Sequence, residues 1–237
     1  MSTQQYYERY WTTEGYFPCR DRTPPFLGQL FARCVDPEDD CLDIGCGDGR
    51  TSGDYLTQNA NSYLGVDVSE NAVTLANLGG FKAKRINDAA ELPIRDCSFD
   101  VAVCIEVLEH LFEPQVAARE AYRILRPGGR YIVTVPNAAY WRDRLDALIG
   151  VWQPGGDDAG RSHPWRSPHV RFFRPATLKR MLQLAGFDPV HIVGVPSPLA
   201  SRVPLLRRFA SHPGLASRLA ARRAPTLLAA GVAAIAF

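Results

Sequence analysis

Short apolar runs alternate along the chain with longer segments whose apolar residues recur at helical spacing. The runs predict strands at residues 41–44, 62–68, 81–86, 99–104, 130–135, 189–195 and 226–237. The longer segments predict helices at residues 50–58, 69–78, 114–125, 140–149, 175–185 and 205–222. Because strands that alternate with helices pair in parallel through right-handed crossovers, we expect an α/β fold with a mostly parallel sheet of seven strands.

Several helix ends carry residues that suit those positions. Ser69 is suited to cap a helix, because its hydroxyl can accept from a backbone N–H of the first turn. Pro114 fits the first turn of a later helix, and we expect the run Pro127, Gly128 and Gly129 to end that helix. Gly186 is the expected stop of the helix at residues 175–185.

Residues 137–173 interrupt the alternation with many glycine, proline, tryptophan and histidine residues. A long irregular segment inside a compact domain is usually functional. Its aromatic and cationic side chains suit a flat or acidic small molecule. These side chains belong to Tyr140, Trp141, Trp152, His163, Trp165, His169 and Arg171.

The charge balance constrains the class of partner. With 27 basic and 25 acidic residues the formal charge is +2, which does not suggest the concentrated basic surface that phosphate contacts need. We therefore expect no nucleic-acid partner. The basic excess lies late, at residues 202–223, where a solvated helical face is favoured over a peripheral contact with anionic lipid or a partner surface.

The cysteines and the chain ends bear on metal binding and location. The six cysteines form no C-x-x-C pair and no Cys/His spacing typical of zinc, so we expect no metal site. Unpaired buried thiols favour a reducing compartment. The first eleven residues lack the pattern of a secretory signal, and the apolar stretch at residues 226–237 is shorter than the ~20 residues that span a bilayer. We expect a cytoplasmic protein.

The strongest motif, L-D-I-G-C-G-D-G, follows a predicted strand and precedes a predicted helix. Gly45, Gly47 and Gly49 let the backbone turn sharply and approach a ligand more closely than a Cβ would permit. Exposed N–H groups at a helix N-terminus favour a carboxylate or phosphate. The G-x-G-x-G spacing differs from the G-x-G-x-x-G of dinucleotide loops, which disfavours a nicotinamide oxidoreductase.

Acidic residues follow the neighbouring strands. Asp67 ends the second strand in G-V-D-V-S, where a carboxylate can accept from both hydroxyls of a ribose. Asp88 follows the third strand. Local roles are the alternatives, since Asp43 and Asp88 could close Asx turns and Asp67 could cap the helix that begins near Ser69.

Together with F-D-V-A-V-C-I-E-V-L-E-H at residues 99–110 and L-R-P-G-G-R before the fifth strand, these motifs resemble class I S-adenosylmethionine-dependent methyltransferases of the methyltransferase 11 type. The resemblance covers residues 41–195. It implies a Rossmann-like, doubly wound sheet with an antiparallel last strand, and S-adenosylmethionine as the cofactor. It also implies a single methyltransferase domain over residues 1–237, divided into an N-terminal helical cover (1–40), a cofactor-binding core (41–136), a substrate lid (137–173) and a C-terminal completion (174–237).

The resemblance assigns cofactor contacts residue by residue. The methionyl end would lie on Asp43, Gly45, Cys46 and Gly47, with Asp43 toward the amino group, and Asp67 would hold the ribose. The adenine would lie on Val68, Asp88 and Ala89, with Asp88 accepting from its amino group. The sulfonium side would be lined by Cys104, Ile105 and Glu106.

The opening Y-Y-E-R-Y-W resembles the N-terminal helix that covers the cofactor in this family. There an aromatic ring can face the positive sulfonium, and Tyr6, Tyr10 and Trp11 are the candidates. Packing of these rings onto the core is the alternative.

Methyl transfer from a sulfonium needs alignment and the removal of one proton, and it requires no nucleophilic serine or cysteine. His110 follows the fourth strand at the carboxyl edge where ligands bind, so it is the first candidate base. His163 and His169 are further candidates in the lid. A structural role in closing the loop before Pro114 is the alternative for Glu109 and His110.

The leading hypothesis is methyl transfer to oxygen or nitrogen of a small metabolite by a monomer or homodimer. The segment P-N-A-A-Y-W-R-D-R-L is also similar to MetW proteins, so the alternative is a methyltransferase-fold partner protein that binds or regulates another enzyme. The N-terminal aromatic extension and the long C-terminal third depart from MetW and favour the small-molecule enzyme.

Overall fold

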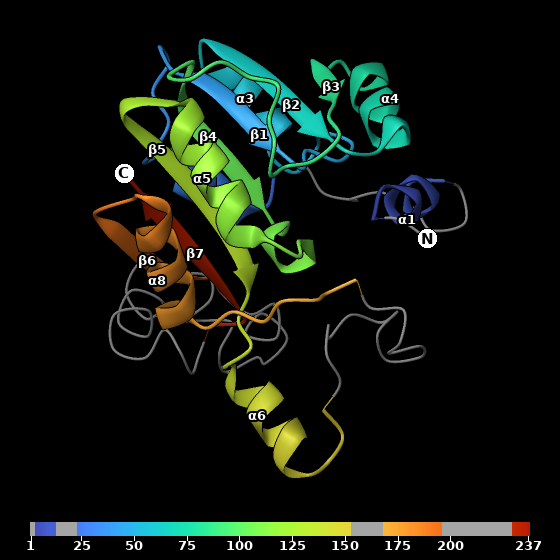
Figure 1. Cartoon of the computed structure of the whole chain (residues 1–237), viewed down its shortest axis with the longest axis vertical. Coiled ribbons are helices and arrows are strands. Elements are labelled where there is room, and N and C mark those ends of the chain that lie inside the picture. The colour runs from blue at the N-terminus through green and yellow to red at the C-terminus, as the bar shows by residue number, and fades with distance from the viewer. Residues whose placement is uncertain (1–2, 13–22, 153–167, 196–228) are drawn as a thin grey trace.

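The computed structural model describes residues 3–12, 23–152, 168–195 and 229–237, and these contain a seven-stranded sheet flanked by helices (Figure 1). The strands are β1 Asp40–Ile44, β2 Ser62–Asp67, β3 Ala83–Arg85, β4 Phe99–Ile105, β5 Leu125–Pro136, β6 Val190–Val195 and β7 Gly231–Ala236. The helices are α1 Thr3–Tyr10, α2 Pro25–Phe31, α3 Gly53–Asn59, α4 Glu70–Leu78, α5 Pro114–Ile124, α6 Trp141–Leu148 and α8 Pro175–Ala185, with a 3-10 turn η1 at Leu108–His110.

The order of the strands in the sheet is β3-β2-β1-β4-β5-β7-β6. The strands from β3 to β5 pair in parallel, whereas β7 runs antiparallel to both β5 and β6. The expected mostly parallel, seven-stranded sheet with an antiparallel last strand is confirmed. This topology brings the carboxyl ends of β1, β2 and β4 to one edge, where ligands of doubly wound folds bind.

The central strands are buried on both faces of the sheet. In β4, Ala102 and Cys104 belong to the apolar cluster beneath α5 and α8, while Val101 and Val103 belong to the cluster beneath α2 and α3. Neighbouring residues of a strand face opposite sides, so both clusters draw on a single continuous apolar run. This explains why β4 shows no alternation of apolar and polar residues.

Two expected boundaries were wrong. Helix α3 begins at Gly53 rather than near residue 50, because Gly49 has a φ of 80° and the Asp48 carboxylate accepts from the backbone N–H of Arg50 at 3.1 Å, which closes a turn. The run of residues 127–129 lies within β5 and does not end α5. That helix ends at Ile124, where the backbone becomes extended and the next residue pairs with β4 across a register shift.

The structure describes the two ends of the lid, residues 137–152 and 168–173, and the first of them contains a helix that projects from the sheet. Helix α6 matches the short helix expected at residues 140–149, and Figure 1 shows it extending away from the body. It has no buried residue, and Trp141, Leu145 and Leu148 are exposed. His163, Trp165 and the basic segment at residues 202–223, with its expected helix, lie outside the described residues.

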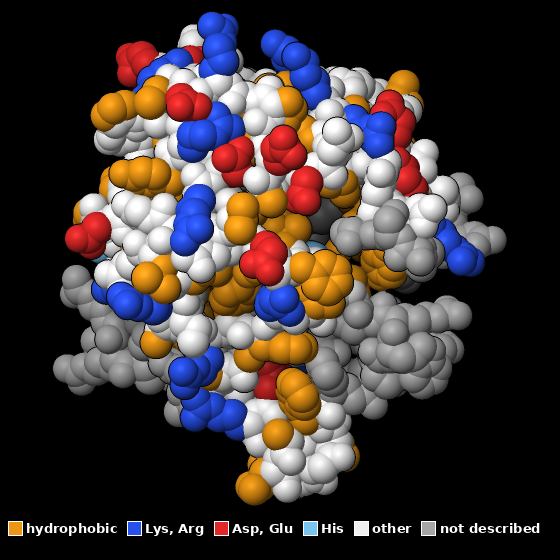
Figure 2. Space-filling model, in the orientation of Figure 1, with side chains coloured by type: hydrophobic (Ala, Val, Ile, Leu, Met, Phe, Trp, Pro, Cys, Tyr) orange, Lys and Arg blue, Asp and Glu red, His pale blue; other side chains and the backbone are white. Residues whose placement is uncertain are grey.

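Charges are mixed on the face that carries α5 and α8, where Figure 2 shows Lys and Arg side chains interspersed with Asp and Glu. Among the described residues, no helix combines the length and the apolar character that a membrane crossing requires.

Helix α1 is joined to the first turn of α4 by Glu8. Its carboxylate accepts from the backbone N–H groups of Glu70 at 2.7 Å and Asn71 at 3.2 Å, and from the hydroxyl of Ser69 at 3.1 Å. Ser69 in turn accepts from the N–H of Ala72 at 3.2 Å, which confirms it as the N-cap of α4. The unpaired N–H groups and the positive end of the helix dipole favour an anion there.

Replacing Glu8 with alanine should release α1, because the helix would lose its anionic contact with α4. We expect faster hydrogen exchange in residues 3–12 and a loss of about 1 kcal/mol in the free energy of unfolding, as for other lost caps. Glu38→Ala removes an exposed carboxylate before β1 and is the matched control. Equal exchange in the Glu8→Ala and Glu38→Ala variants would contradict this role.

Candidate functional site

The glycine loop after β1 folds directly against the end of β2. The N–H of Gly47 donates to Oδ2 of Asp67 at 3.0 Å. The N–H groups of Gly45 and Cys46 donate to the carbonyl of Val66 at 2.8 and 3.1 Å. The loop and the carboxylate, 20 residues apart in sequence, therefore lie together at the carboxyl edge of the sheet.

These bonds correct one expectation about the loop. The N–H groups of Gly45, Cys46 and Gly47 donate to acceptors of the chain itself, and that of Gly49 donates to the carbonyl of Cys46 at 3.0 Å. They are therefore not exposed for a ligand carboxylate. Gly45, Gly47 and Gly49 have φ values of 75°, 56° and 80°, so glycine serves here to permit the turn and the close approach of other groups.

Two side chains occupy the space that the missing Cβ atoms leave. A Cβ on Gly45 would lie 2.5 Å from Cγ2 of Val107, and a Cβ on Gly47 would lie 2.7 Å from the indole of Trp11. Val107 belongs to the E-V-L-E-H segment after β4, so this segment packs directly against the glycine loop. Trp11 follows α1, so the N-terminal segment covers the loop.

The aromatic residues of α1 form a connected row above this edge. Tyr10 packs edge to face against both Tyr7 and Trp11 and remains 39% exposed, and Tyr7 packs edge to face against His110 with ring centroids 5.9 Å apart. Burial raises the pKa of Tyr7 above its ordinary value. Tyr7 is not among the candidates expected from the sequence, although its spacing of three and four residues from Tyr10 and Trp11 puts the rings on one side of a helix.

Asp43 lies beneath the loop and is almost fully buried. Its Oδ2 accepts from the hydroxyl of Tyr63 at 3.0 Å. Burial raises the pKa of Asp43 to about 7, and the charge of Asp67 adds to the shift. This carboxyl therefore changes its charge near neutral pH.

Asp88 makes the Asx turn that its alternative anticipated, whereas Asp67 does not cap α4, because Ser69 is the N-cap of that helix. Oδ1 of Asp67 accepts from the N–H of Ser69 at 2.9 Å, and Oδ1 of Asp88 accepts from the N–H of Ala90 at 2.8 Å in an Asx turn. Each carboxylate oxygen has two lone pairs, so these bonds leave room for a ligand hydroxyl or amino group. Asp88 is exposed, whereas Asp67 is buried.

The other expected contacts differ in what they can present to a ligand. The Cys46 thiol lies in the core against Gly65, so only the backbone of Cys46 borders the loop surface. Cys104 is also buried, and burial raises the pKa of its thiol to about 12. Ala89 is buried, whereas Val68 and Ile105 are partly buried. Glu106 has a φ of 55°, a rare conformation for a residue with a Cβ, at the point where β4 turns into η1.

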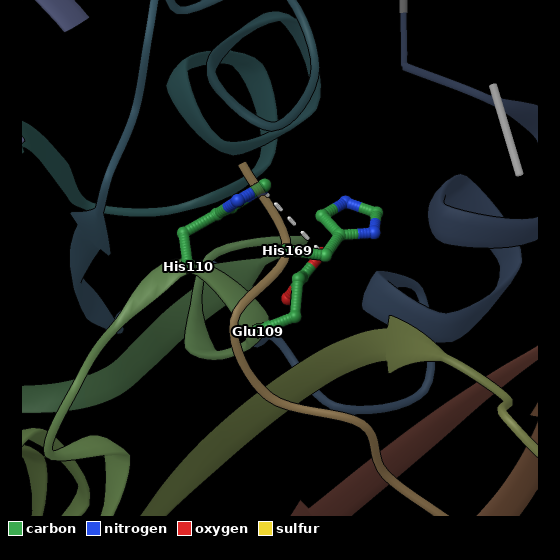
Figure 3. A group of neighbouring side chains, drawn as sticks. All are labelled: Glu109, His110 and His169. Carbon is green, nitrogen blue, oxygen red and sulfur yellow. Dashed lines mark ion pairs between the residues drawn. The ribbon is translucent and has the colours of Figure 1, made fainter. Parts of the chain in front are cut away.

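The turn after β4 binds the C-terminal end of the lid through backbone hydrogen bonds. The carbonyl of Glu109 accepts from the N–H groups of Val170 and Arg171 at 2.9 and 3.0 Å. These two bonds bring His169 onto η1, where its ring centroid lies 4.8 Å from that of His110 (Figure 3). The structure thus joins two of the three candidate bases, from positions 59 residues apart. His163 lies outside the described residues.

Glu109 is a buried carboxyl beside these rings. Its side chain is 2% exposed, and its Oε1 lies 3.7 Å from Nε2 of His110. Burial raises the pKa of Glu109 to about 9, and the neighbouring charge of Glu106 adds to the shift. The sequence indicates for Glu109 only a role in closing the loop before Pro114, because no local pattern signals its burial.

Alanine substitutions at Gly45 and, as a matched control, at Gly80 test the packing of the glycine loop by its effect on stability. Gly45→Ala would place a Cβ against Val107, whereas Gly80→Ala would meet no atom within 4 Å at a similar φ of 88°. Left-handed strain should cost each variant about 1–2 kcal/mol in the free energy of unfolding. The clash should cost Gly45→Ala a further ~1–3 kcal/mol in urea unfolding. Equal losses in the two variants would show that Val107 does not require glycine at position 45.

Comparison with known proteins agrees with this geometry. Residues 42–133 match the methyltransferase 11 family model, described as a methyltransferase domain. A protein of Mycolicibacterium smegmatis, named as a probable S-adenosylmethionine-dependent methyltransferase, is 32% identical over 170 residues, which are 70% of this chain and 58% of that relative. The chain thus spans less than two thirds of that relative's length. The ubiquinone biosynthesis O-methyltransferase of Idiomarina loihiensis is 28% identical over 209 residues, covering 79% of this chain and 78% of the relative.

The solved structure of an S-adenosylmethionine-dependent methyltransferase from Thermotoga maritima shares the fold. It is 20% identical, with a TM-score of 0.62, and the match covers 99% of each chain. The family match lies on β1 to β5, which carry the glycine loop, Asp67 and the turn with His110. Residues 42–133 therefore match a methyltransferase family model, and the chain is similar in sequence and in fold to S-adenosylmethionine-dependent methyltransferases.

Proposed function

We propose that this chain transfers the methyl group of S-adenosylmethionine to an oxygen or nitrogen of a small metabolite. The main support is the 3.0 Å hydrogen bond from Gly47 to Asp67, which joins the glycine loop to a carboxylate at the edge where His110 and His169 also lie. The name of the Idiomarina loihiensis relative, an O-methyltransferase of ubiquinone biosynthesis, supports a small acceptor.

The residues at this edge fit the chemical groups of the cofactor. Asp67 keeps lone pairs for two ribose hydroxyls, Asp88 is exposed toward solvent for an amino group, and Asp43 supplies negative charge beneath the loop. The rings of Tyr10 and Trp11 suit a positively charged sulfur. When bound, S-adenosylmethionine supplies a methyl group on an electrophilic sulfonium.

The chain's own contribution is alignment and proton removal. Methyl transfer breaks one carbon–sulfur bond, forms one carbon–oxygen or carbon–nitrogen bond, and leaves one proton to be removed from the acceptor. The imidazoles of His110 and His169 are the proposed site for that proton, because they lie past β4 at the ligand edge. Arg171 donates to the carbonyl of Phe112 at 2.6 Å and holds the lid segment beside them.

Calorimetric titration with S-adenosylhomocysteine tests the cofactor site. The Asp67→Asn variant replaces a charged acceptor with a neutral amide, whose oxygen or NH₂ would then face the N–H of Gly47 or a ribose hydroxyl. We therefore expect the affinity for S-adenosylhomocysteine to fall at least about tenfold, or ~1.4 kcal/mol. Glu38→Gln should bind as the wild type does. Failure of the wild-type chain to bind S-adenosylhomocysteine at millimolar concentration would contradict the proposal. An assay of methyl transfer to a panel of phenols and amines would test the proposed class of acceptor.

The pH dependence of the same titration tests Asp43. Its pKa of about 7 in the free protein should fall when the positive amino group of the ligand binds, because an opposite charge favours the ionised carboxyl. Binding therefore releases a proton below pH 7, and affinity should rise roughly tenfold from pH 6 to pH 8 as the ionised fraction rises. Asp43→Asn should abolish this rise. A wild-type affinity that stays constant or falls over this range would refute the assignment.

A further inference from the structure

Three metal-ligating groups meet where the lid segment crosses η1. Glu109 and His110 come from η1 and His169 from the segment that follows Pro168, and Figure 3 shows the three side chains together. One ligand atom from each residue lies within 4.8 Å of the other two. The sequence spacing did not indicate this group, because His169 is 59 residues from His110.

The carboxyl of Glu109 lacks the partners that its burial demands. The residue is 1% exposed, and neither carboxyl oxygen meets hydrogen-bond geometry with a described residue, although the carboxyl of Glu106 is a close neighbour. Burying an unsatisfied polar group is costly, and buried carboxylates are usually paired or bound to a metal ion. Oε1 instead faces Nε2 of His110 at 3.7 Å.

The imidazole of His110 is oriented as a metal ligand would be. Its Nδ1 lies 3.3 Å from the carbonyl oxygen of Pro168. Since a carbonyl can only accept, this contact favours the proton on Nδ1 and leaves the lone pair of Nε2 facing Glu109. Metal-bound histidines commonly donate their outer N–H to a carbonyl in this way.

Backbone bonds hold the third group in position. The N–H groups of Val170 and Arg171 both donate to the carbonyl of Glu109, so His169 is fixed to the turn that carries the other two residues. Ligand atoms around a four-coordinate ion with bonds of ~2.0–2.1 Å lie roughly 3.3 Å apart, so small side-chain rotations would close the group.

We propose that Glu109, His110 and His169 bind a divalent transition-metal ion of the Zn²⁺ or Co²⁺ type. Two imidazoles and one carboxylate suit such ions and leave a coordination position for water or an acceptor oxygen. An acceptor oxygen bound there would have a lower pKa and would lose its proton to solvent water more readily. With a metal ion bound, the imidazoles would act as its ligands, and this role would replace the direct proton acceptance proposed above. This catalytic consequence rests on the proposed function, whereas metal binding does not.

Titration of the metal-stripped full-length chain with Zn²⁺ and Co²⁺, without cofactor or acceptor, tests the site. We expect one ion per chain and visible absorption from bound Co²⁺. His169→Ala and Glu109→Gln should each weaken binding at least about 100-fold, since loss of a ligand should exceed the effect of losing an outer-shell partner. His191→Ala removes an exposed histidine of β6 that packs on Phe237, and it should bind as the wild type does.

Circular dichroism should show that each variant is folded. If Glu109→Gln does not fold, His169→Ala still tests the site, because it changes the lid segment and leaves the residues of η1 unchanged. No saturable binding by the wild-type chain, or equal affinity in the His169→Ala variant, would overturn the metal site. Titration of the metal-free chain with S-adenosylhomocysteine separates the two proposals, because that binding depends on Asp67 and should persist in His169→Ala.

Discussion

The carboxylate of Asp67 is the contact on which the arrangement of this edge depends. One oxygen accepts from Gly47 in the loop after β1, and the other accepts from Ser69 at the start of α4. Burial raises the pKa of Asp67 even though these bonds oppose the shift. This buried carboxylate links the glycine loop to the start of α4, beside the two backbone bonds that the loop makes to Val66.

The same network reaches the N-terminal cover. Ser69 donates to Glu8, which also accepts from the first N–H groups of α4, and α1 carries the aromatic row that ends with Trp11 over Gly47. The glycine loop is therefore enclosed from below by Asp67 and from above by Trp11. Ligand hydroxyls that bind Asp67 would join a network that already includes the cover, so cofactor binding and the position of α1 should be coupled.

The cover and the lid meet at one point. Tyr7 of α1 packs against His110, and His110 packs against His169 of the lid segment. Residues from the start, the middle and the last third of the chain thus surround the end of β4. The parallel sheet makes this possible, because it brings the loops after its strands to a common edge.

Much of the fold could be predicted from the sequence, because periodicity and turn residues are local signals. The apolar run of β4, the N-cap Ser69 and the stop at Gly186 all lie where their residue types indicate. The glycine loop was also found, but the direction of its N–H groups was not, since their acceptors lie on β2. The N–H of Asn71 donates to Glu8, and the buried Glu109 lies close to His169. Both features bring together residues that are far apart in sequence. Such contacts depend on packing and leave no periodic trace.

The most direct test of this account is a crystal structure of the chain with S-adenosylhomocysteine bound. We predict that both ribose hydroxyls lie within hydrogen-bonding distance of the Asp67 carboxylate, about 2.5–3.0 Å, with the sulfur on the side of His110. A ligand bound elsewhere, with Asp67 bonded only to Gly47 and Ser69, would contradict the account.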